Sequence, residues 1–296
     1  MPNIIILGKG YVGTYLFSEL SKNTDNHVTA ISRKEVDYFD SIALKRYIRE
    51  TQHIHHNDYE DIIILNCSGY TGRPNVDGCE SNKELCLKYN TELPVSLSHF
   101  CKRNKFWLIN VSSGCIFSGY EKNFTEDDIP NFGIYSTESS FYSKCKHLNE
   151  ILCNKDVTTN LRIRMPFCGF NSDRNFLNKI LNYSNLVSFD NSLTCLEDLL
   201  VFIEKFIKLE YYKILPGIYN VINPGSANAK QIVDLLSRNN LINPNWTFVD
   251  INSLSLKANR SNCVLSDNKI AELDLQLPPV FDSLEKCIGS LSEHNS

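Results

Sequence analysis

The sequence lacks the features that mark several classes of protein. It has no apolar stretch near the roughly 18 residues that a transmembrane helix requires, so we expect no membrane-spanning segment. It has no excess of basic residues, with 30 Lys and Arg against 34 Asp and Glu. That balance argues against nucleic-acid binding and membrane-surface binding, since both favour basic patches. No charged, cleavable leader precedes the first apolar segment, and we therefore expect a cytoplasmic protein.

The eleven cysteines, spread from Cys67 to Cys287, include no C-x-x-C pair. Zinc-ribbon and thioredoxin-like sites use such pairs, so neither kind of site is expected. In a chain of this length without a secretion signal, we expect most of these cysteines to be buried, reduced thiols. His53, His55 and His56 stand close together, but the polar segment around them offers no fourth ligand. We therefore expect no metal site.

Short apolar segments alternate along the chain with segments whose apolar residues recur at helical spacing. The apolar segments predict buried parallel strands at residues 3–7, 27–31, 62–65, 106–111 and 161–165. The helical spacing predicts helices at residues 12–20, 41–50, 83–102, 141–152, 197–209 and 228–238. Strands that alternate with helices form βαβ units. The predicted fold is therefore α/β, a doubly wound parallel sheet of the Rossmann type.

A glycine-rich turn follows the first predicted strand. Gly8, Gly10 and Gly13 match the pattern G-x-G-x-x-G, with a strand before the turn and a helix after it. The first glycine permits a tight turn, the second lets the backbone approach a pyrophosphate, and the third permits close packing of helix and strand. The helix N-terminus, which includes Tyr11 and Val12, offers free N–H groups to phosphates. The turn predicts a dinucleotide cofactor.

The end of the second predicted strand bears on which dinucleotide is bound. Folds that prefer NAD usually carry Asp or Glu near this position. Here Ile31 is followed by Ser32, Arg33 and Lys34. A hydroxyl and two cations suit a 2′-phosphate better than a free ribose diol. NADP(H) is therefore favoured, and NAD(H) is the alternative if the two cations are only solvated.

The alternation of strands and helices weakens after about residue 168, where loops rich in Asn, Pro and Ser appear. We assign residues 1–168 to an NADP-binding domain, to which residues of about 187–222 return. Residues 169–186 and 223–296 form a smaller, interleaved C-terminal lobe that binds the substrate. No Gly/Ser linker separates the two parts.

A Ser–Tyr–Lys set supplies the candidate catalytic residues. Tyr142 and Lys146 are four residues apart and lie on one face of a predicted helix. A phenol has a pKa of about 10, so it needs a neighbouring positive charge to exchange protons readily near neutral pH. Ser113 follows the strand predicted at residues 106–111, where its hydroxyl can hydrogen-bond a substrate carbonyl. Together with the glycine turn, the set predicts reduction of a carbonyl group.

The order of these motifs resembles that of extended short-chain dehydrogenase/reductases, and within them the dTDP-4-dehydrorhamnose reductase branch. The resemblance extends to bifunctional 3,5-epimerase/4-reductases of UDP-rhamnose synthesis. It covers about residues 3 to 265. The supporting segments are Gly8–Gly13, Asn66–Gly69, Gly72–Asp77, Ser112–Phe117, Pro130–Phe132, Ser140–Lys146, Arg162–Pro166, Arg174–Phe176 and Asn223–Gly225.

The resemblance implies roles for the loop after the strand at residues 62–65. Cys67, Ser68 and Gly69 would line the cofactor through backbone contacts. Asn90, on the helix that follows, would order a water behind Lys146; the other interpretation is a helix-surface residue. The triad Ser113, Tyr142 and Lys146 would reduce a C4 ketone with a hydride from NADPH, and Tyr142 and Lys146 would also contact the cofactor.

The resemblance also implies an epimerase function. Inverting a carbon next to a ketone requires a base on one face and an acid on the other. Cys115, two residues after Ser113, would supply one of these groups. Lys179, in a segment that resembles R-N-F-x-x-K, would supply the other. The alternatives are an inert core thiol and a surface charge.

Three residues are implied in substrate binding. Arg260 matches the position that holds the nucleotide diphosphate, where the fork of a guanidinium suits two phosphates. Arg73 and Asn175 are further substrate contacts. The expected partner is a UDP- or dTDP-linked sugar, and a homodimer is compatible with the sequence.

Several other functions share parts of this pattern. A reductase or an epimerase with only one of the two activities would carry most of it, and so would 4-epimerases. The 4,6-dehydratases need an acidic pair after the triad Ser or Thr, which Gly114 and Cys115 do not provide. A non-catalytic NADP-binding regulatory subunit has no chemical need for an intact triad. The leading hypothesis is a nucleotide-sugar epimerase/reductase.

Overall fold

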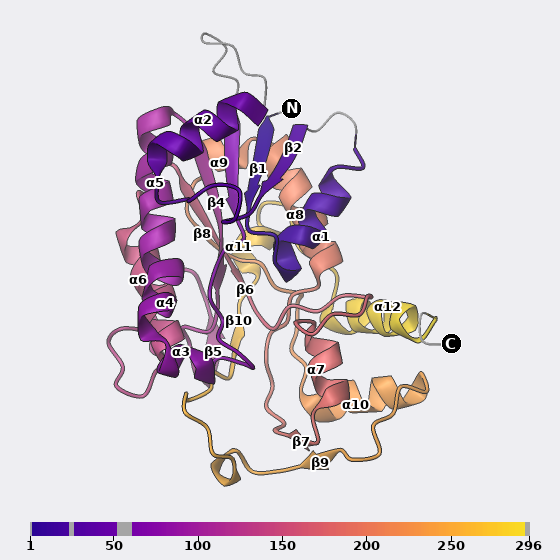
Figure 1. Cartoon of the computed structure of the whole chain (residues 1–296). Helices are drawn as coiled ribbons and strands as arrows, with labels where there is room; N and C mark the ends of the chain where they lie inside the picture. Colours follow the sequence, from indigo (N-terminus) through magenta and orange to yellow (C-terminus); the bar gives the residue numbers. More distant parts are fainter. Residues whose placement is uncertain (1, 24–26, 52–60, 294–296) are drawn as a thin grey trace.

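The computed structural model describes residues 2–23, 27–51 and 61–293 (Figure 1). Six strands form one parallel sheet in the order β2-β1-β3-β4-β6-β8. The strands are β1 (Asn3–Leu7), β2 (His27–Ile31), β3 (Ile62–Asn66), β4 (Trp107–Ser113), β6 (Thr158–Ile163) and β8 (Ile218–Asn220). Because β2 and β3 lie on opposite sides of β1, the strand order reverses there, and the predicted doubly wound α/β fold is confirmed. His53, His55 and His56 lie outside the described residues.

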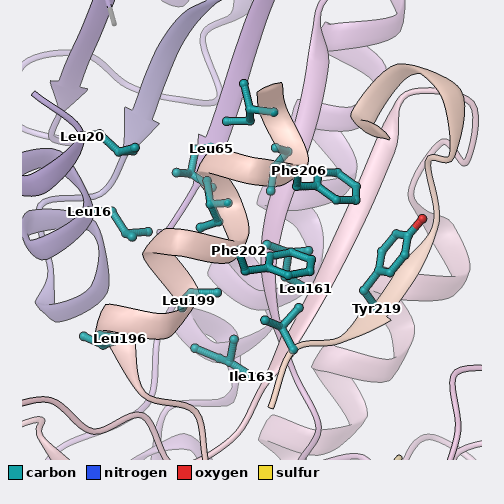
Figure 2. Close-up of a cluster of buried hydrophobic side chains, with 14 of the residues drawn as sticks. Leu16, Leu20, Leu65, Leu161, Ile163, Leu196, Leu199, Phe202, Phe206 and Tyr219 are labelled. Carbon is teal, nitrogen blue, oxygen red and sulfur yellow. The ribbon is translucent and has the colours of Figure 1, made fainter. Parts of the chain in front are cut away.

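The central strands are apolar on both faces because helices cover both faces. In β1, Ile4 and Ile6 join one hydrophobic core, whereas Ile5 and Leu7 join the other. The first core is covered by α1 (Tyr11–Leu20), α8 (Leu196–Lys208) and α9 (Tyr211–Ile214). The second is covered by α2 (Ser41–Thr51) and α5 (Leu93–Asn104). Figure 2 shows side chains of α1 and α8 packed against Leu65 and Leu161 of the sheet.

A second group of short helices packs beside α5. It consists of α3 (Asp77–Ser81), α4 (Lys83–Leu87), a π-helix (Lys88–Glu92) and α6 (Phe141–Leu152). The α6 helix contacts the other three. The segment at residues 83–102, predicted as largely helical, is thus helical throughout but changes hydrogen-bond pattern in its middle.

A separate hydrophobic core joins α7 (Phe176–Asn182), α10 (Ala229–Arg238) and α12 (Val280–Glu293), which lie below and to the right of the sheet in Figure 1. Two small parallel sheets accompany it, β5 (Gly119–Phe124) with β10 (Cys263–Leu265) and β7 (Asn185–Leu186) with β9 (Thr247–Phe248). The remaining elements are a 3-10 turn (Ile251–Ser253) and α11 (Asn268–Ala271). Between these parts, α8 and β8 return to the large sheet and its core. The division into two lobes at the predicted boundaries stays a prediction.

The β6 strand begins at Thr158, earlier than the predicted start at residue 161. One of its polar first residues, Asn160, is buried as part of a row of amides that crosses the sheet. Asn66 donates to Asn110 at 2.8 Å, and Asn110 donates to Asn160 at 2.7 Å. These residues occupy adjacent register positions on β3, β4 and β6. The amides satisfy one another, so burial does not leave them unpaired.

All eleven cysteines are free thiols, and nine of them are buried. The two that are partly exposed are Cys67 and Cys115, both in predicted site segments. Cys195 and Cys287 have sulfur atoms 3.6 Å apart, and the Cys195 thiol donates to Glu197 at 3.2 Å. The expectation of buried, reduced thiols is confirmed. Within the described ranges, no helix combines the length and apolar character needed to cross a membrane.

Candidate active site

The glycine turn uses its three glycines for different purposes. Gly8 has φ +102, and its N–H donates to the Ile31 carbonyl at 2.9 Å. A Cβ on Gly13 would lie 2.0 Å from the Gly8 carbonyl oxygen, so helix and strand touch there. A Cβ on Gly10, the N-cap of α1, would meet nothing within 4 Å. Gly8 and Gly13 therefore pack the turn, whereas Gly10 leaves its outer surface open.

The loop after β3 lies directly beside this turn. A Cβ on Gly8 would come within 2.6 Å of the Ser68 Oγ, and a Cβ on Gly13 would lie 3.1 Å from the Cys67 Cβ. The turn and the loop stand at the carboxyl ends of β1 and β3, where the strand order reverses. Dinucleotides bind at such a position, with the pyrophosphate against the helix N-terminus. The open surface at Gly10 and the free end of α1 fit this group.

The residues after β2 are held together by a carboxylate that the sequence analysis did not single out. Glu35 accepts a hydrogen bond from the Ser32 N–H at 2.7 Å and pairs with Lys9 at 3.0 Å. The Arg33 guanidinium stacks on the ring of Tyr89 at 4.1 Å. The predicted cofactor residues Ser32 and Arg33 thus lie at one end of the dinucleotide site. Glu35 could have been recognised from the sequence, because it directly follows Lys34 in the predicted cofactor segment.

The catalytic set converges at the carboxyl end of β4. Ser113 ends the strand, whereas Tyr142 and Lys146 project from the first two turns of α6. Ser140 caps this helix, accepting a hydrogen bond from the Ser143 N–H at 3.1 Å. The cap fixes where α6 starts and therefore where Tyr142 points. Structure and sequence agree on both ends of α6.

The local environment shifts the pKa values of both helix residues. Burial raises the pKa of Tyr142, and the nearby Cys115 thiol acts in the same direction, against a hydrogen bond from Ser113. Burial lowers the pKa of Lys146, which the Glu150 carboxylate partly opposes. The Lys146 Nζ lies 5.9 Å from the centre of the Tyr142 ring and donates to the Val111 carbonyl at 3.3 Å. Tyr142 is thus kept protonated, as a proton donor must be.

Asn90 lies in the π-helix beneath this set. Its amide donates to the Tyr70 carbonyl at 2.7 Å and accepts from the Tyr70 N–H at 3.2 Å. A Cβ on Gly69 would lie 3.1 Å from the Asn90 Oδ1 and 4.0 Å from the Lys146 Nζ. Asn90 therefore fixes the loop that faces Lys146. Single-turn π-helices occur frequently at functional sites.

Cys115 stands on the loop after β4, beside the triad. Its N–H donates to the Ser113 Oγ at 3.1 Å, and its carbonyl accepts from the Ser143 hydroxyl at 2.6 Å. The backbone of Cys115 is thus fixed to both the strand and α6, while the side chain stays partly exposed. This placement suits a thiol that meets a substrate.

A buried arginine behind Cys115 was missed by the sequence analysis. Arg164 donates to the Gly114 carbonyl at 3.0 Å and to the Ser261 hydroxyl at 2.9 Å, and it also bonds the Asn191 side chain. The guanidinium joins the loop that carries Cys115 to the segment before β10. The motif Arg162-Ile163-Arg164 was visible, but nothing in a single sequence distinguishes a buried arginine from a solvated one.

The short α7 helix carries two predicted residues with different environments. Asn175 is fully buried, and its amide donates to the Cys168 and Phe170 carbonyls at 2.9 Å each and accepts from the Leu177 N–H. This geometry caps α7 and engages both the nitrogen and the oxygen of the Asn175 amide. The substrate contact predicted for Asn175 stays a prediction. Lys179 is partly buried, and burial and the Arg174 charge lower the pKa of its ammonium group.

Arg174 and Arg260 join later segments of the chain to the loop after β3 and to the start of α3. Arg174 donates to the Thr71 hydroxyl and the Gly72 carbonyl at 3.0 Å each. Arg260 pairs with Asp77 at 2.8 Å. Burial raises the pKa of Asp77, but hydrogen bonds from Arg260 and from the Ala258 N–H hold it below its usual value. The predicted diphosphate ligand Arg260 is therefore engaged by a carboxylate.

Arg73 is exposed beside these contacts, between Gly72 and a cis-proline. It stands on the loop that Arg174 holds. Its predicted contact with a substrate stays a prediction.

Comparison with known proteins places this chain in a family. The family model described as the RmlD substrate binding domain matches residues 2–200. A bifunctional dTDP-4-dehydrorhamnose 3,5-epimerase/dTDP-4-dehydrorhamnose reductase of Arabidopsis thaliana is 34% identical over 239 residues, which cover 76% of this chain and 75% of that protein. A trifunctional UDP-glucose 4,6-dehydratase/UDP-4-keto-6-deoxy-D-glucose 3,5-epimerase/UDP-4-keto-L-rhamnose-reductase of the same plant is also 34% identical, over 34% of its own length.

Solved structures share the fold over nearly the whole chain. The L780 UDP-rhamnose synthase of Acanthamoeba polyphaga mimivirus superposes with a TM-score of 0.82 and 25% identity, covering 98% of this chain and 100% of that chain. A dTDP-4-dehydrorhamnose reductase from Bacillus anthracis, solved in complex with NADP, has a TM-score of 0.78 at 19% identity, with both chains fully covered. The second likeness shows the shared fold.

Proposed function

The chain belongs to the family defined by the RmlD substrate binding domain, and from this membership we propose an NADP(H)-dependent nucleotide-sugar epimerase/reductase. The substrate is a nucleotide-linked 4-keto-6-deoxyhexose. The enzyme inverts C3 and C5 and reduces the C4 ketone. The observation that carries the proposal is the placement of Cys115 beside an intact Ser113–Tyr142–Lys146 set at the carboxyl end of β4.

The residues divide the reduction between them. Bound NADPH supplies the hydride. The Ser113 hydroxyl orients the C4 carbonyl, and Tyr142 gives its phenolic proton to the oxygen as negative charge develops there. The raised pKa of Tyr142 keeps that proton available near neutral pH. Lys146 then stabilises the phenolate that remains, since an ammonium favours the charged form of its neighbour.

Epimerisation uses residues from both lobes. Cys115 lies beside the triad, and Lys179 lies on α7 near Arg174, which contacts the loop after β3. One of the two removes a proton next to the ketone and the other returns a proton on the opposite face. Tyr142 and Ser113 stabilise the enolate oxygen in between. Lys179 suits this exchange because its lowered pKa makes its two protonation states easier to interconvert near neutral pH.

A second function, a non-catalytic subunit, would make the same dinucleotide site without turnover. An activity assay distinguishes the enzyme from the non-catalytic subunit. The protein is mixed with NADPH and UDP- or dTDP-4-keto-6-deoxyglucose, and the absorbance of NADPH is followed. We expect cofactor oxidation that depends on the keto-sugar, and the Tyr142→Phe variant as a control should lose it. Absence of oxidation with every nucleotide keto-sugar, despite NADPH binding, would contradict the proposal and favour the subunit.

A further inference from the structure

The carboxylate of Glu35 folds back onto the donors at the end of β2. Its oxygens accept from the Ser32 N–H at 2.7 Å and from the Lys9 ammonium at 3.0 Å. The Tyr47 hydroxyl lies 3.4 Å from the same group. Hydrogen bonds from the Ser32 hydroxyl, from Lys9 and from the Ser32 backbone lower the pKa of Glu35 to about 2. Glu35 is therefore a full negative charge at neutral pH.

These donors form an anion-binding set at a position where dinucleotides differ. In doubly wound folds, the ribose next to the adenine lies at the end of the second strand. A 2′-phosphate there would need hydrogen-bond donors and cations. Ser32 offers a backbone N–H and a hydroxyl, and Lys9 offers an ammonium. In the observed arrangement, Glu35 already accepts from the Ser32 N–H and from the Lys9 ammonium.

The remaining cations at this position are not neutralised in the same way. Arg33 stacks on Tyr89, and Lys34 is exposed. Across residues 2–23, 27–51 and 61–293, neither forms an ion pair with a carboxylate. A 2′-phosphate thus meets two available cations and one carboxylate that occupies the other donors. A ribose 2′-hydroxyl, in contrast, can donate to that carboxylate.

We propose that Glu35 sets the choice between NADPH and NADH. Its carboxylate acts as an internal anion that a 2′-phosphate must displace from Ser32 and Lys9, whereas the 2′-hydroxyl of NADH leaves it in place. The chain therefore binds both cofactors, and its preference for NADPH is smaller than Ser32, Arg33 and Lys34 alone would produce. This inference rests on the proposed dinucleotide site but not on the proposed sugar chemistry.

The test is the Glu35→Gln variant of the full chain, with the dissociation constants of NADPH and NADH measured by calorimetry without any sugar. Glutamine keeps an acceptor for the Ser32 N–H but removes the charge. Two like charges a few ångströms apart near a surface cost on the order of 1–2 kcal/mol, or about tenfold in affinity. We expect NADPH to bind about tenfold more tightly to the variant, and NADH to bind equally well or more weakly.

Glu19→Gln is the matched control, because Glu19 also pairs with a lysine, Lys22 at 2.7 Å, but lies on the outer part of α1. It removes the same charge and should leave the ratio of the two constants unchanged. An unchanged ratio in Glu35→Gln, or an equal shift in both variants, would overturn the inference. If the wild-type chain binds neither cofactor, the dinucleotide site itself is wrong. If it binds both but reduces no keto-sugar, only the proposed sugar chemistry fails.

Discussion

At the scale of single residues, we expect Tyr142 to have the most direct effect on ketone reduction. Replacing it with Phe removes the proton donor while keeping the ring. General acid catalysis contributes roughly 10²–10⁴ in rate, so we expect a loss of that order in ketone reduction with NADPH binding retained. Turnover and calorimetric binding of NADPH on the same preparation would check this. Equal loss of binding and turnover would indicate a structural role for the hydroxyl.

The pH dependence of reduction follows from the same residue. Burial raises the pKa of Tyr142 above its ordinary value, which is about 10. The phenol therefore stays protonated throughout the neutral and mildly alkaline range, and the rate of reduction should show no fall from Tyr142 ionisation below about pH 10. A fall centred near pH 8 that tracks the ionisation of Tyr142 would contradict this assignment.

A substitution at Cys115 should affect the proposed epimerisation but not the proposed reduction. Cys115→Ser keeps a small polar side chain but removes the thiol to which the proposal assigns one of the two proton transfers. We expect exchange of the C3 or C5 proton with solvent to fall strongly, while reduction of an already epimerised 4-keto sugar continues. The matched control is Cys101→Ser, a buried thiol on α5 that packs in the core covered by α2 and α5. Normal exchange in Cys115→Ser would remove Cys115 from the mechanism.

The sequence indicated these candidate catalytic residues because their spacing and order carry the signal. It could not predict the partners of isolated polar residues. Asn175 was expected to contact substrate, but it caps α7 through contacts with Cys168 and Phe170. Arg260 was expected to hold phosphates and pairs with Asp77. Such pairings depend on which loops meet across the sheet edge, and residue type does not determine that.

At the scale of elements, the turn before α1 makes a testable distinction between two glycines. Gly13→Ala would place a Cβ 2.0 Å from the Gly8 carbonyl oxygen, so we expect a lower yield of folded protein or a clearly reduced Tm. Gly10→Ala meets no atom within 4 Å, so we expect a normal Tm but weaker dinucleotide binding. Thermal unfolding with and without NADPH would measure both. Unchanged NADPH binding in Gly10→Ala would contradict the assigned path of the pyrophosphate.

The α7 helix offers a second pair of variants. Asn175→Ala removes the N-cap and leaves two buried carbonyls without their donor, which should cost about 2–4 kcal/mol of unfolding free energy. Lys179→Met removes a partly buried ammonium that burial disfavours, so its stability should be unchanged or higher. We expect Lys179→Met to lose solvent exchange at C3 and C5 despite its stability. Denaturant unfolding and an exchange assay together check the pair.

Element boundaries were predicted correctly where apolar residues recur at regular spacing, as in β1 and α6. They were missed where polar residues are buried. The start of β6 was placed too late because Thr158 and Asn160 do not look like residues of a central strand. The amide row through Asn110 explains why Asn160 is tolerated there. The π-helix could not be predicted from the sequence either, since the apolar residues around Lys88–Glu92 keep ordinary helical spacing.

At the scale of the whole molecule, the sheet brings two sites to one edge. The dinucleotide turn stands at the ends of β1 and β3, and the Ser–Tyr–Lys set stands at the end of β4, the strand next to β3. The separate core that joins α7, α10 and α12 lies outside this sheet, and α7 carries Lys179. Hydrogen bonds from Arg174 and Arg260 join later segments of the chain to the loop after β3 and to the start of α3. This arrangement is the basis of our proposal that proton exchange and hydride transfer act on one bound sugar.

The central claim is that one site both epimerises and reduces a nucleotide 4-keto-6-deoxy sugar. The most direct measurement is turnover of UDP- or dTDP-4-keto-6-deoxyglucose with NADPH in deuterated water, with the product analysed by NMR and mass spectrometry. We expect a product reduced at C4 that carries solvent deuterium at C3 and C5. A product reduced at C4 without deuterium at either carbon would contradict the epimerase half of the claim.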